Sequence, residues 1–121
     1  METKRMTNLK LLREATGGES SVMKEVIESF IDQLPTLRKG FRNHLQNKQW
    51  KELGNTARMA KASVMTVGLN ELAEHLQKMQ MKIFKEVGFD SYPLYIEEFE
   101  TVTTLAEVEL TEELFKLRST N

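Results

Sequence analysis

The amino-acid sequence predicts an all-α protein, an antiparallel four-helix bundle with a short additional N-terminal helix. Apolar residues follow helical spacing wherever their spacing is regular. The 121 residues include only six glycines and two prolines, so few helix-breaking positions interrupt that pattern. No Asn-Gly or Asp-Gly pair marks a β-hairpin turn. A chain of this length fits one domain, and we expect residues 1–121 to form a single one.

The first predicted helix is short and the second is long. Thr7 stands where it can cap the first helix, and the pair Gly17–Gly18 ends it. The second helix begins at the polar region 19–21 and continues to about Asn47. Pro35 lies inside its apolar stripe. Because a proline inside a helix removes a backbone hydrogen bond, we expect a kink or a break there.

The third and fourth helices are joined by a very short link. From Trp50 to Val67, apolar residues recur in steps of three and four, and Gly68 then ends the helix. The fourth helix starts at Leu69 and ends near Gly88. Because only about two residues link these helices, they must be antiparallel neighbours.

A turn over residues 88–93 precedes the last helix, and Ser91 is in position to cap that helix. The fifth helix runs from about Leu94 to Leu117, with Leu105 among its expected inward positions. Four long amphipathic helices with short links can bury their apolar stripes only against one another. We therefore expect them to form the bundle, with the short first helix covering one end.

Composition argues against several functional classes. The chain has no cysteine, which excludes disulfides, thiolate metal sites and cysteine nucleophiles. Seventeen Lys and Arg against 18 Asp and Glu give a formal net charge of −1, which argues against a nucleic-acid partner. No apolar run approaches the ~20 residues of a membrane span, and the N-terminus lacks the apolar region of a signal peptide. We expect a cytoplasmic protein with no membrane partner and no small-molecule substrate.

The two histidines, His44 and His75, each stand alone on their predicted helices. A zinc site on one helix needs a second ligand three or four residues away. The Glu-x-x-His spacing of di-iron bundles is absent too, so we expect no metal and no cofactor. Phosphate-binding loops and nucleophile elbows are also missing, and we expect no enzymatic activity and no catalytic residue.

One outward strip of the third predicted helix is unusual. A projection at about 100° per residue places five residues on it: Gly54, Arg58, Lys61, Ala62 and Met65. Arg58 and Lys61 lie one turn apart, and the small residues Gly54 and Ala62 leave them uncovered. One interpretation is a solvated face with two chance cations, because Lys and Arg are abundant on surfaces. The other is a partner-binding site for an anionic protein surface.

The residues around this strip form an extended motif. It comprises Trp50–Lys51–Glu52–Leu53, Ala57–Arg58–Met59–Ala60–Lys61–Ala62–Ser63, Val67–Gly68–Leu69 and Leu72. It is preceded by a long helix with an internal proline, which contributes Phe30, Leu34–Pro35, Leu37 and Leu45. Together these residues resemble the histidine-containing phosphotransfer (HPt) domain over roughly residues 8 to 86.

The resemblance implies an HPt-like bundle that acts in two-component phosphorelay signalling. It implies that Arg58 occupies the position of the phospho-accepting histidine, and Lys61 that of the lysine that helps to hold the phosphoryl group. Ala62 keeps the family's small residue and Gly68 its helix break. An arginine has a pKa above about 12 and no free lone pair. Because a phosphohistidine needs a neutral imidazole nitrogen, Arg58 cannot carry the phosphoryl group.

We therefore expect the domain to dock on a response-regulator receiver domain without transferring phosphate. As the resemblance implies, such a partner presents an acidic pocket that Arg58 can enter as a cation. Two alternatives remain open. One is a helical protein–protein interaction module unrelated to phosphorelays, with Val108 and Phe115 as leftover apolar positions. The other is phosphotransfer through His75. Whether Arg58 and Lys61 are exposed together on the third helix is the observation that best distinguishes receiver docking from these alternatives.

Overall fold

The structure is a computed structural model, and it describes residues 6–119. Over these residues it is all-α, as the sequence predicts, and contains no strand. The elements in chain order are α1 Lys10–Ala15, α2 Ser20–Gln46, α3 Trp50–Thr66, α4 Asn70–Phe84, the 3₁₀ turn η1 Phe89–Ser91, and α5 Tyr92–Ser119. No helix within this part of the chain combines the length and the apolarity that crossing a membrane requires.

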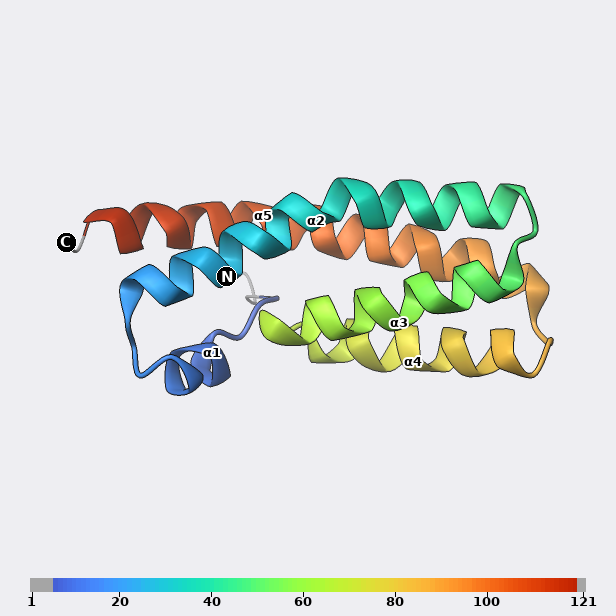
Figure 1. The fold of residues 1–121 in the computed structure, drawn as a ribbon, viewed down its shortest axis with the longest axis horizontal. Coiled ribbons are helices and arrows are strands. Elements are labelled where there is room, and N and C mark those ends of the chain that lie inside the picture. The colour runs from blue at the N-terminus through green and yellow to red at the C-terminus, as the bar shows by residue number, and fades with distance from the viewer. Residues whose placement is uncertain (1–5, 120–121) are drawn as a thin grey trace, which may run out of the picture.

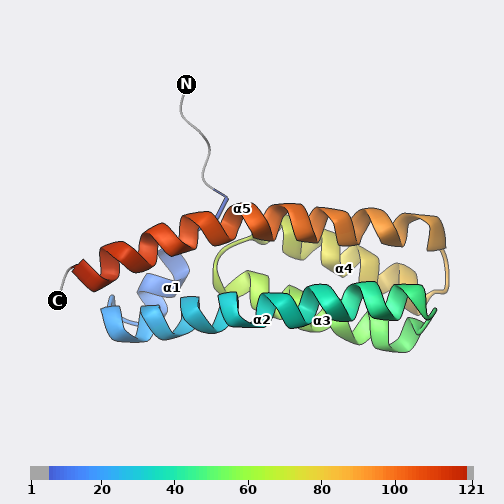
Figure 2. The same cartoon turned by 90° about the horizontal axis from the view of Figure 1, so that it is seen from above.

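The four long helices lie side by side, and the chain reverses direction at each link (Figure 1). Helix α2 packs against both α3 and α5, and α4 packs against the same two helices from the other side. The first part of α2 and the last part of α5 extend beyond α3 and α4, and α1 lies beside this extension (Figures 1 and 2). The side chains of Leu9, at the start of α1, and Leu12, within it, are buried.

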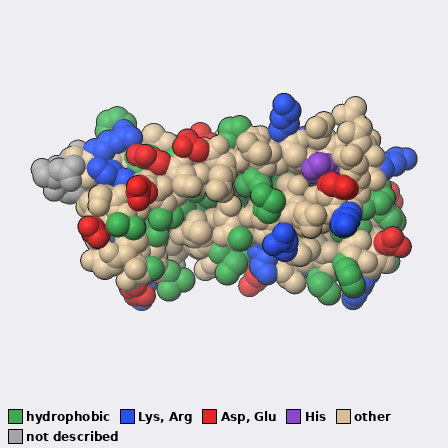
Figure 3. Space-filling view, viewed as in Figure 1, with side chains coloured by type: hydrophobic (Ala, Val, Ile, Leu, Met, Phe, Trp, Pro, Cys, Tyr) green, Lys and Arg blue, Asp and Glu red, His purple; other side chains and the backbone are tan. Residues whose placement is uncertain are grey.

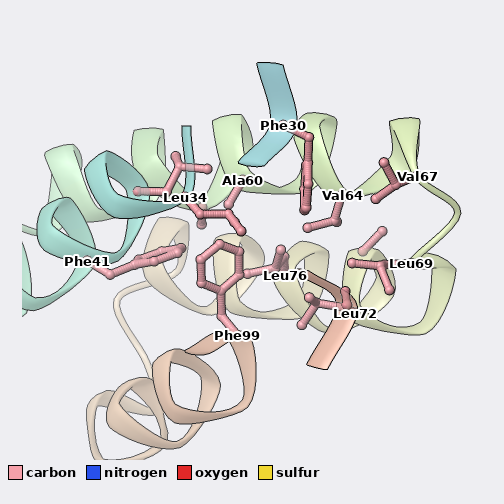
Figure 4. Packing of buried hydrophobic residues seen from close by; sticks show 14 of the residues in the cluster. Phe30, Leu34, Phe41, Ala60, Val64, Val67, Leu69, Leu72, Leu76 and Phe99 are labelled. Atoms are coloured by element: carbon pink, nitrogen blue, oxygen red, sulfur yellow. The ribbon is translucent and has the colours of Figure 1, made fainter. Parts of the chain in front are cut away.

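The core consists of aliphatic and aromatic side chains from all four long helices. Figure 4 shows Phe30, Leu34 and Phe41 of α2 facing Leu76 of α4 and Phe99 of α5. The rings of Phe41 and Phe99 meet edge to face with 5.1 Å between their centroids. Each fully buried side chain of this size contributes roughly 1.5–3 kcal/mol by leaving water, so this layer stabilises the contact between α2 and α5.

Helix α5 departs from one sequence-based expectation, because Leu105 points outward and is 52% exposed. The buried face runs through Phe99, Thr103 and Ala106 instead. The hydroxyl of the buried Thr103 keeps a hydrogen-bond partner, because it donates to the Phe99 carbonyl oxygen at 2.6 Å. A polar residue on the buried face of a helix cannot be recognised from the spacing of apolar residues alone.

Helix α2 runs through Pro35 without a break. Figure 1 shows its axis changing direction near the middle of the helix, which is the part of α2 that contains Pro35. The expectation of a kink or a break at Pro35 is therefore resolved in favour of a continuous, bent helix. The hydrogen bond that a proline cannot donate accounts for a bend at this point.

The segment before α1 has a different role from the predicted cap. The Thr7 hydroxyl does not cap α1 but donates to Glu109 Oε1 of α5 at 2.8 Å. The Asn8 N–H donates to the Val67 carbonyl oxygen at 3.0 Å. At Gly68, with φ +75°, a Cβ would lie 2.1 Å from the Asn8 carbonyl oxygen. Only glycine fits there, so residues 7–8 tie α5 to the link between α3 and α4.

The link before α5 is also tighter than predicted. The 3₁₀ turn follows Gly88, and α5 starts at Tyr92. The Ser91 hydroxyl donates to the Gly88 carbonyl oxygen at 2.6 Å, which closes the turn. The buried Tyr92 hydroxyl donates to the Val87 carbonyl oxygen at 2.7 Å. Burial, and secondly the charge of Glu86, raises the pKa of Tyr92. These contacts fix where α5 begins.

Candidate partner-binding surface on helix α3

Helix α3 has an inner face of small side chains and an outer face of polar and flexible ones. Leu53, Ala57, Ala60 and Val64 are fully buried at the three-and-four spacing that the sequence shows. Alanines at two of these positions let α3 approach α2 and α4 closely. Figure 3 shows Lys and Arg side chains over the middle of α3 on the opposite face, with hydrophobic side chains beside them.

Arg58 projects from α3 into a groove of about 750 Å³ between α2 and α3. The residue is exposed, and within residues 6–119 its guanidinium makes no hydrogen bond or ion pair. Three carboxylate residues of α2 line the same groove: Glu25, Glu28 and Asp32. The sequence reasoning missed these acidic residues. Their spacing puts them on one face of α2, but only the packing of α2 on α3 shows that this face borders Arg58.

Lys61 differs from Arg58 in its surroundings. Its side chain is half-buried, and its Nζ donates to Gln77 Oε1 of α4 at 2.6 Å. Lys61 also lines a separate groove of about 510 Å³ between α3 and α4, together with Met65, Gln77 and Lys78. The two cations of the predicted strip therefore lie on different sides of the α3 ridge. Arg58 has its charge available to a partner, whereas Lys61 has already formed a contact.

The remaining strip residues divide in the same way. Ala62 is exposed and lines the groove beside Arg58, so it leaves that side chain uncovered as the sequence suggests. Met65 is 52% exposed. Gly54 is half-buried, and a Cβ at this position would lie 3.4 Å from Ile83 Cγ2 of α4. The absence of a side chain at Gly54 therefore serves the packing of α4. Met59, which the projection left out, is 55% exposed and lines the groove with Arg58.

The two histidines lie away from this surface. His75 faces α5, because its Nδ1 lies 2.5 Å from Glu98 Oε2. His44 Nδ1 lies 2.9 Å from Gln49 Oε1. Since Gln77 reaches α3 while His75 reaches α5, His75 is on the other flank of α4 from the Lys61 contact. Among residues 6–119, no three His, Asp or Glu side chains gather as a metal site would need.

The outer face of α5 carries a second exposed apolar surface. Val108 is 58% exposed and Phe115 is 67% exposed. Both line a groove of about 460 Å³ that also includes Arg38, Glu107 and Glu112. Apolar side chains rimmed by charged ones are typical of protein-binding surfaces.

Comparison with protein-family models finds no match to this chain, and comparisons with curated proteins and with solved structures find no significant match either.

Proposed function

We propose that this chain is an HPt-like signalling module that docks on the receiver domain of a response regulator without accepting its phosphoryl group. In this proposal the four long helices form an antiparallel HPt-type bundle, with α1 as the additional N-terminal helix. The module acts in the cytoplasm, where it occupies the receiver and prevents a competent phosphotransfer domain from binding. The partner is a protein, and the interaction needs no cofactor.

The observation that carries this proposal is the exposed, unpaired guanidinium of Arg58 on the outer face of α3. The resemblance puts this residue where an HPt domain has its phospho-accepting histidine. A guanidinium cannot act as the nucleophile, but it is a permanent cation with a planar fork of donors that matches a carboxylate. A receiver's acidic pocket is a surface that such a group can enter.

The surroundings of Arg58 favour a partner that approaches closely. Ala62 and Ser63 line the groove with short side chains, so a partner's surface can reach the guanidinium. Met59 adds a flexible apolar contact beside it. Glu25, Glu28 and Asp32 of α2 line the same groove, so an acidic partner is repelled except where Arg58 compensates. This arrangement favours one docking register over its neighbours.

Titration of receiver domains from the organism's own response regulators into the purified chain tests this proposal. A receiver that binds the wild type should bind Arg58→Glu about a hundredfold more weakly, because the charge reversal leaves its acidic pocket facing a carboxylate. Lys116→Glu makes the same change in charge at an exposed position of α5 and should leave binding unchanged. Equal affinity of wild type and Arg58→Glu for every receiver that binds would refute the proposal.

A second candidate function is a helical interaction module unrelated to phosphorelays, in which α5 contacts the partner. It is favoured by the exposure of Val108 and Phe115 in one groove. If this surface mediates self-association, light scattering will show a mass that rises with concentration and returns to that of the monomer in Val108→Asp. A monomer at all concentrations, together with receiver binding that depends on Arg58, would exclude self-association as the function of this surface.

A further inference from the structure

The chain contains two histidines with different partners. His75 Nδ1 lies 2.5 Å from a carboxylate oxygen of Glu98, whereas His44 Nδ1 lies 2.9 Å from the side-chain amide oxygen of Gln49. Both oxygens are acceptors, so each neutral imidazole carries its proton on Nδ1 and its lone pair on Nε2. Only His75 has a partner whose negative charge can stabilise an imidazolium. The two histidines thus share a tautomer and differ in the charge beside it.

Solvent can reach the second nitrogen of His75. The side chain is 29% exposed. Among the half-buried and buried side chains of residues 6–119, the one nitrogen or oxygen that is sealed from solvent without a hydrogen bond is Arg38 Nε. His75 Nε2 makes no hydrogen bond and is not sealed, so its lone pair is accessible. An imidazole held by a carboxylate on one nitrogen and open on the other has the arrangement of an activated nucleophile.

A cation lies one helical turn from His75. Lys78 follows it by three residues on α4, so the two residues are neighbours on the helix surface, although Lys78 also lines the groove between α3 and α4. Lys78 is exposed and makes no hydrogen bond or ion pair within the described residues. Glu71 and Glu74 are also exposed on α4, and together with the Glu98 carboxylate they repel an anion. Lys78 is therefore the group that can attract an anionic reagent to His75 against this repulsion.

We propose that His75 is a phosphoryl-accepting site for small donors with a good leaving group, that is, acyl phosphates or phosphoramidate. The Nε2 lone pair attacks phosphorus and forms the N–P bond. The bond from phosphorus to the leaving carboxylate, or to the leaving ammonia, breaks and its electron pair departs with that group. Nδ1 keeps its proton, and the Glu98 carboxylate stabilises the resulting imidazolium. This site is separate from Arg58, and the inference does not depend on receiver docking.

Phosphoramidate is the probe for the test, because its leaving group is ammonia and it needs no enzyme. The full chain is incubated with it, and the phosphorylated histidine is located by tandem mass spectrometry over time. We expect His75 to react at least about tenfold faster than His44 in the same molecule. Equal rates at the two histidines would overturn the proposal.

A reciprocal exchange of partners sharpens this test. Glu98→Gln gives His75 the kind of amide partner that His44 has, and should reduce its rate to that of His44. Gln49→Glu gives His44 a carboxylate and should raise its rate. Lys78→Ala should slow His75 severalfold without affecting His44. A Glu98→Gln variant that reacts as fast as wild type would show that the carboxylate has no role, and would also overturn the proposal.

Glu98 acts through His75, so its variant needs a readout of the imidazole itself. ¹⁵N NMR of the ring nitrogens reports which nitrogen carries the proton, and the backbone amide spectrum reports whether the fold is retained. In wild type and in Glu98→Gln we expect the proton on Nδ1, with the reaction rate as the property that differs. Glu97→Gln removes the charge of an exposed neighbour and should leave the rate at His75 unchanged. A similar loss of rate in Glu97→Gln would assign the effect to general charge rather than to the His75–Glu98 pair and would contradict the proposal.

Discussion

The arginines between α2 and α5 and the arginine on the outer face of α3 have opposite uses. Arg42 forms a two-pronged contact with Glu100, through Nε at 2.9 Å and Nη2 at 2.6 Å. Arg38 donates to the buried Thr103 hydroxyl at 3.0 Å and lies 3.7 Å from Glu107. Arg58 makes no such contact within residues 6–119, although carboxylates line its groove. The α2–α5 arginines therefore hold the fold together, whereas Arg58 is left available for a partner.

The change with the largest expected effect restores a nucleophile to the α3 surface. Arg58→His, made in a His75→Asn background, replaces a group with no lone pair by an imidazole at the same exposed position. We expect acid-labile label on residue 58 after mixing with a phosphorylated receiver, where the His75→Asn parent shows none. If the folded variant binds the receiver but takes up no label, the surface around residue 58 lacks more than the nucleophile. Met65 would then be the first residue to replace, because of its bulk.

A second change tests whether the arginines between α2 and α5 stabilise the fold. Thr103→Val keeps the shape of the buried side chain but removes the oxygen that accepts from Arg38. We expect the free energy of unfolding to fall by about 1–2 kcal/mol, because Arg38 loses a hydrogen-bond partner at a buried position. Receiver binding should not change. Thr104→Val is the control, because Thr104 is exposed and its contact with Arg38 is long, at 3.5 Å. A larger loss in the control would contradict this assignment.

A third change concerns the Arg42–Glu100 pair and its dependence on pH. The hydrogen bond from Arg42 lowers the pKa of Glu100 against the opposing effect of burial. A lowered pKa in the folded state adds stability above the ordinary glutamate pKa of ~4.3, and this stability is lost as the pH falls through the lowered value. We expect Glu100→Gln to reduce the free energy of unfolding at pH 7 by about 0.5–1 kcal/mol. The difference from wild type should shrink in acid, and urea titrations at several pH values can measure it. A difference in the free energy of unfolding that grows as the pH falls would contradict the lowered pKa of Glu100.

The smallest expected effect is at the second cation of α3. Gln77→Leu removes the acceptor that holds Lys61 Nζ and so releases its charge toward solvent. Receiver affinity should rise about twofold, which is the scale of one more exposed cation near an acidic surface. Isothermal titration at low salt is the suitable measurement. A decrease in affinity would indicate that Lys61 contributes through its present, fixed position.

The all-α class and the limits of α2 and α3 could be predicted because they depend on local spacing and on glycine positions, whereas α4 ends at Phe84 rather than near Gly88 and α5 starts at Tyr92 rather than Leu94. The steps from Trp50 to Val67 and the break at Gly68 match α3 and the turn that follows it. Contacts between helices could not be predicted in this way. The burial of Thr103 and the role of Gly54 against α4 depend on packing that no single helix reveals.

The candidate site was also predictable only where it depends on a single helix. The exposure of Arg58 follows from the helical projection, and the structure agrees. The hydrogen bond from Lys61 to Gln77 depends on how α3 and α4 align, because sixteen positions separate these residues. The carboxylates around Arg58 belong to α2 and enter the groove only when the helices pack. A sequence can therefore identify exposed cations, but not which of them already has a hydrogen-bond partner on another helix.

A double-mutant cycle across the complex tests most directly whether Arg58 occupies the partner's acidic pocket. It combines Arg58→Ala in this chain with an aspartate-to-alanine change at the receiver's phospho-accepting residue, and affinity is measured for all four pairs. We predict a coupling energy of at least about 1.5 kcal/mol between the two positions, the range of close charge pairs at an interface. Two changes whose effects simply add would show that the guanidinium does not meet that carboxylate, and the account of a docking, non-transferring module would be wrong.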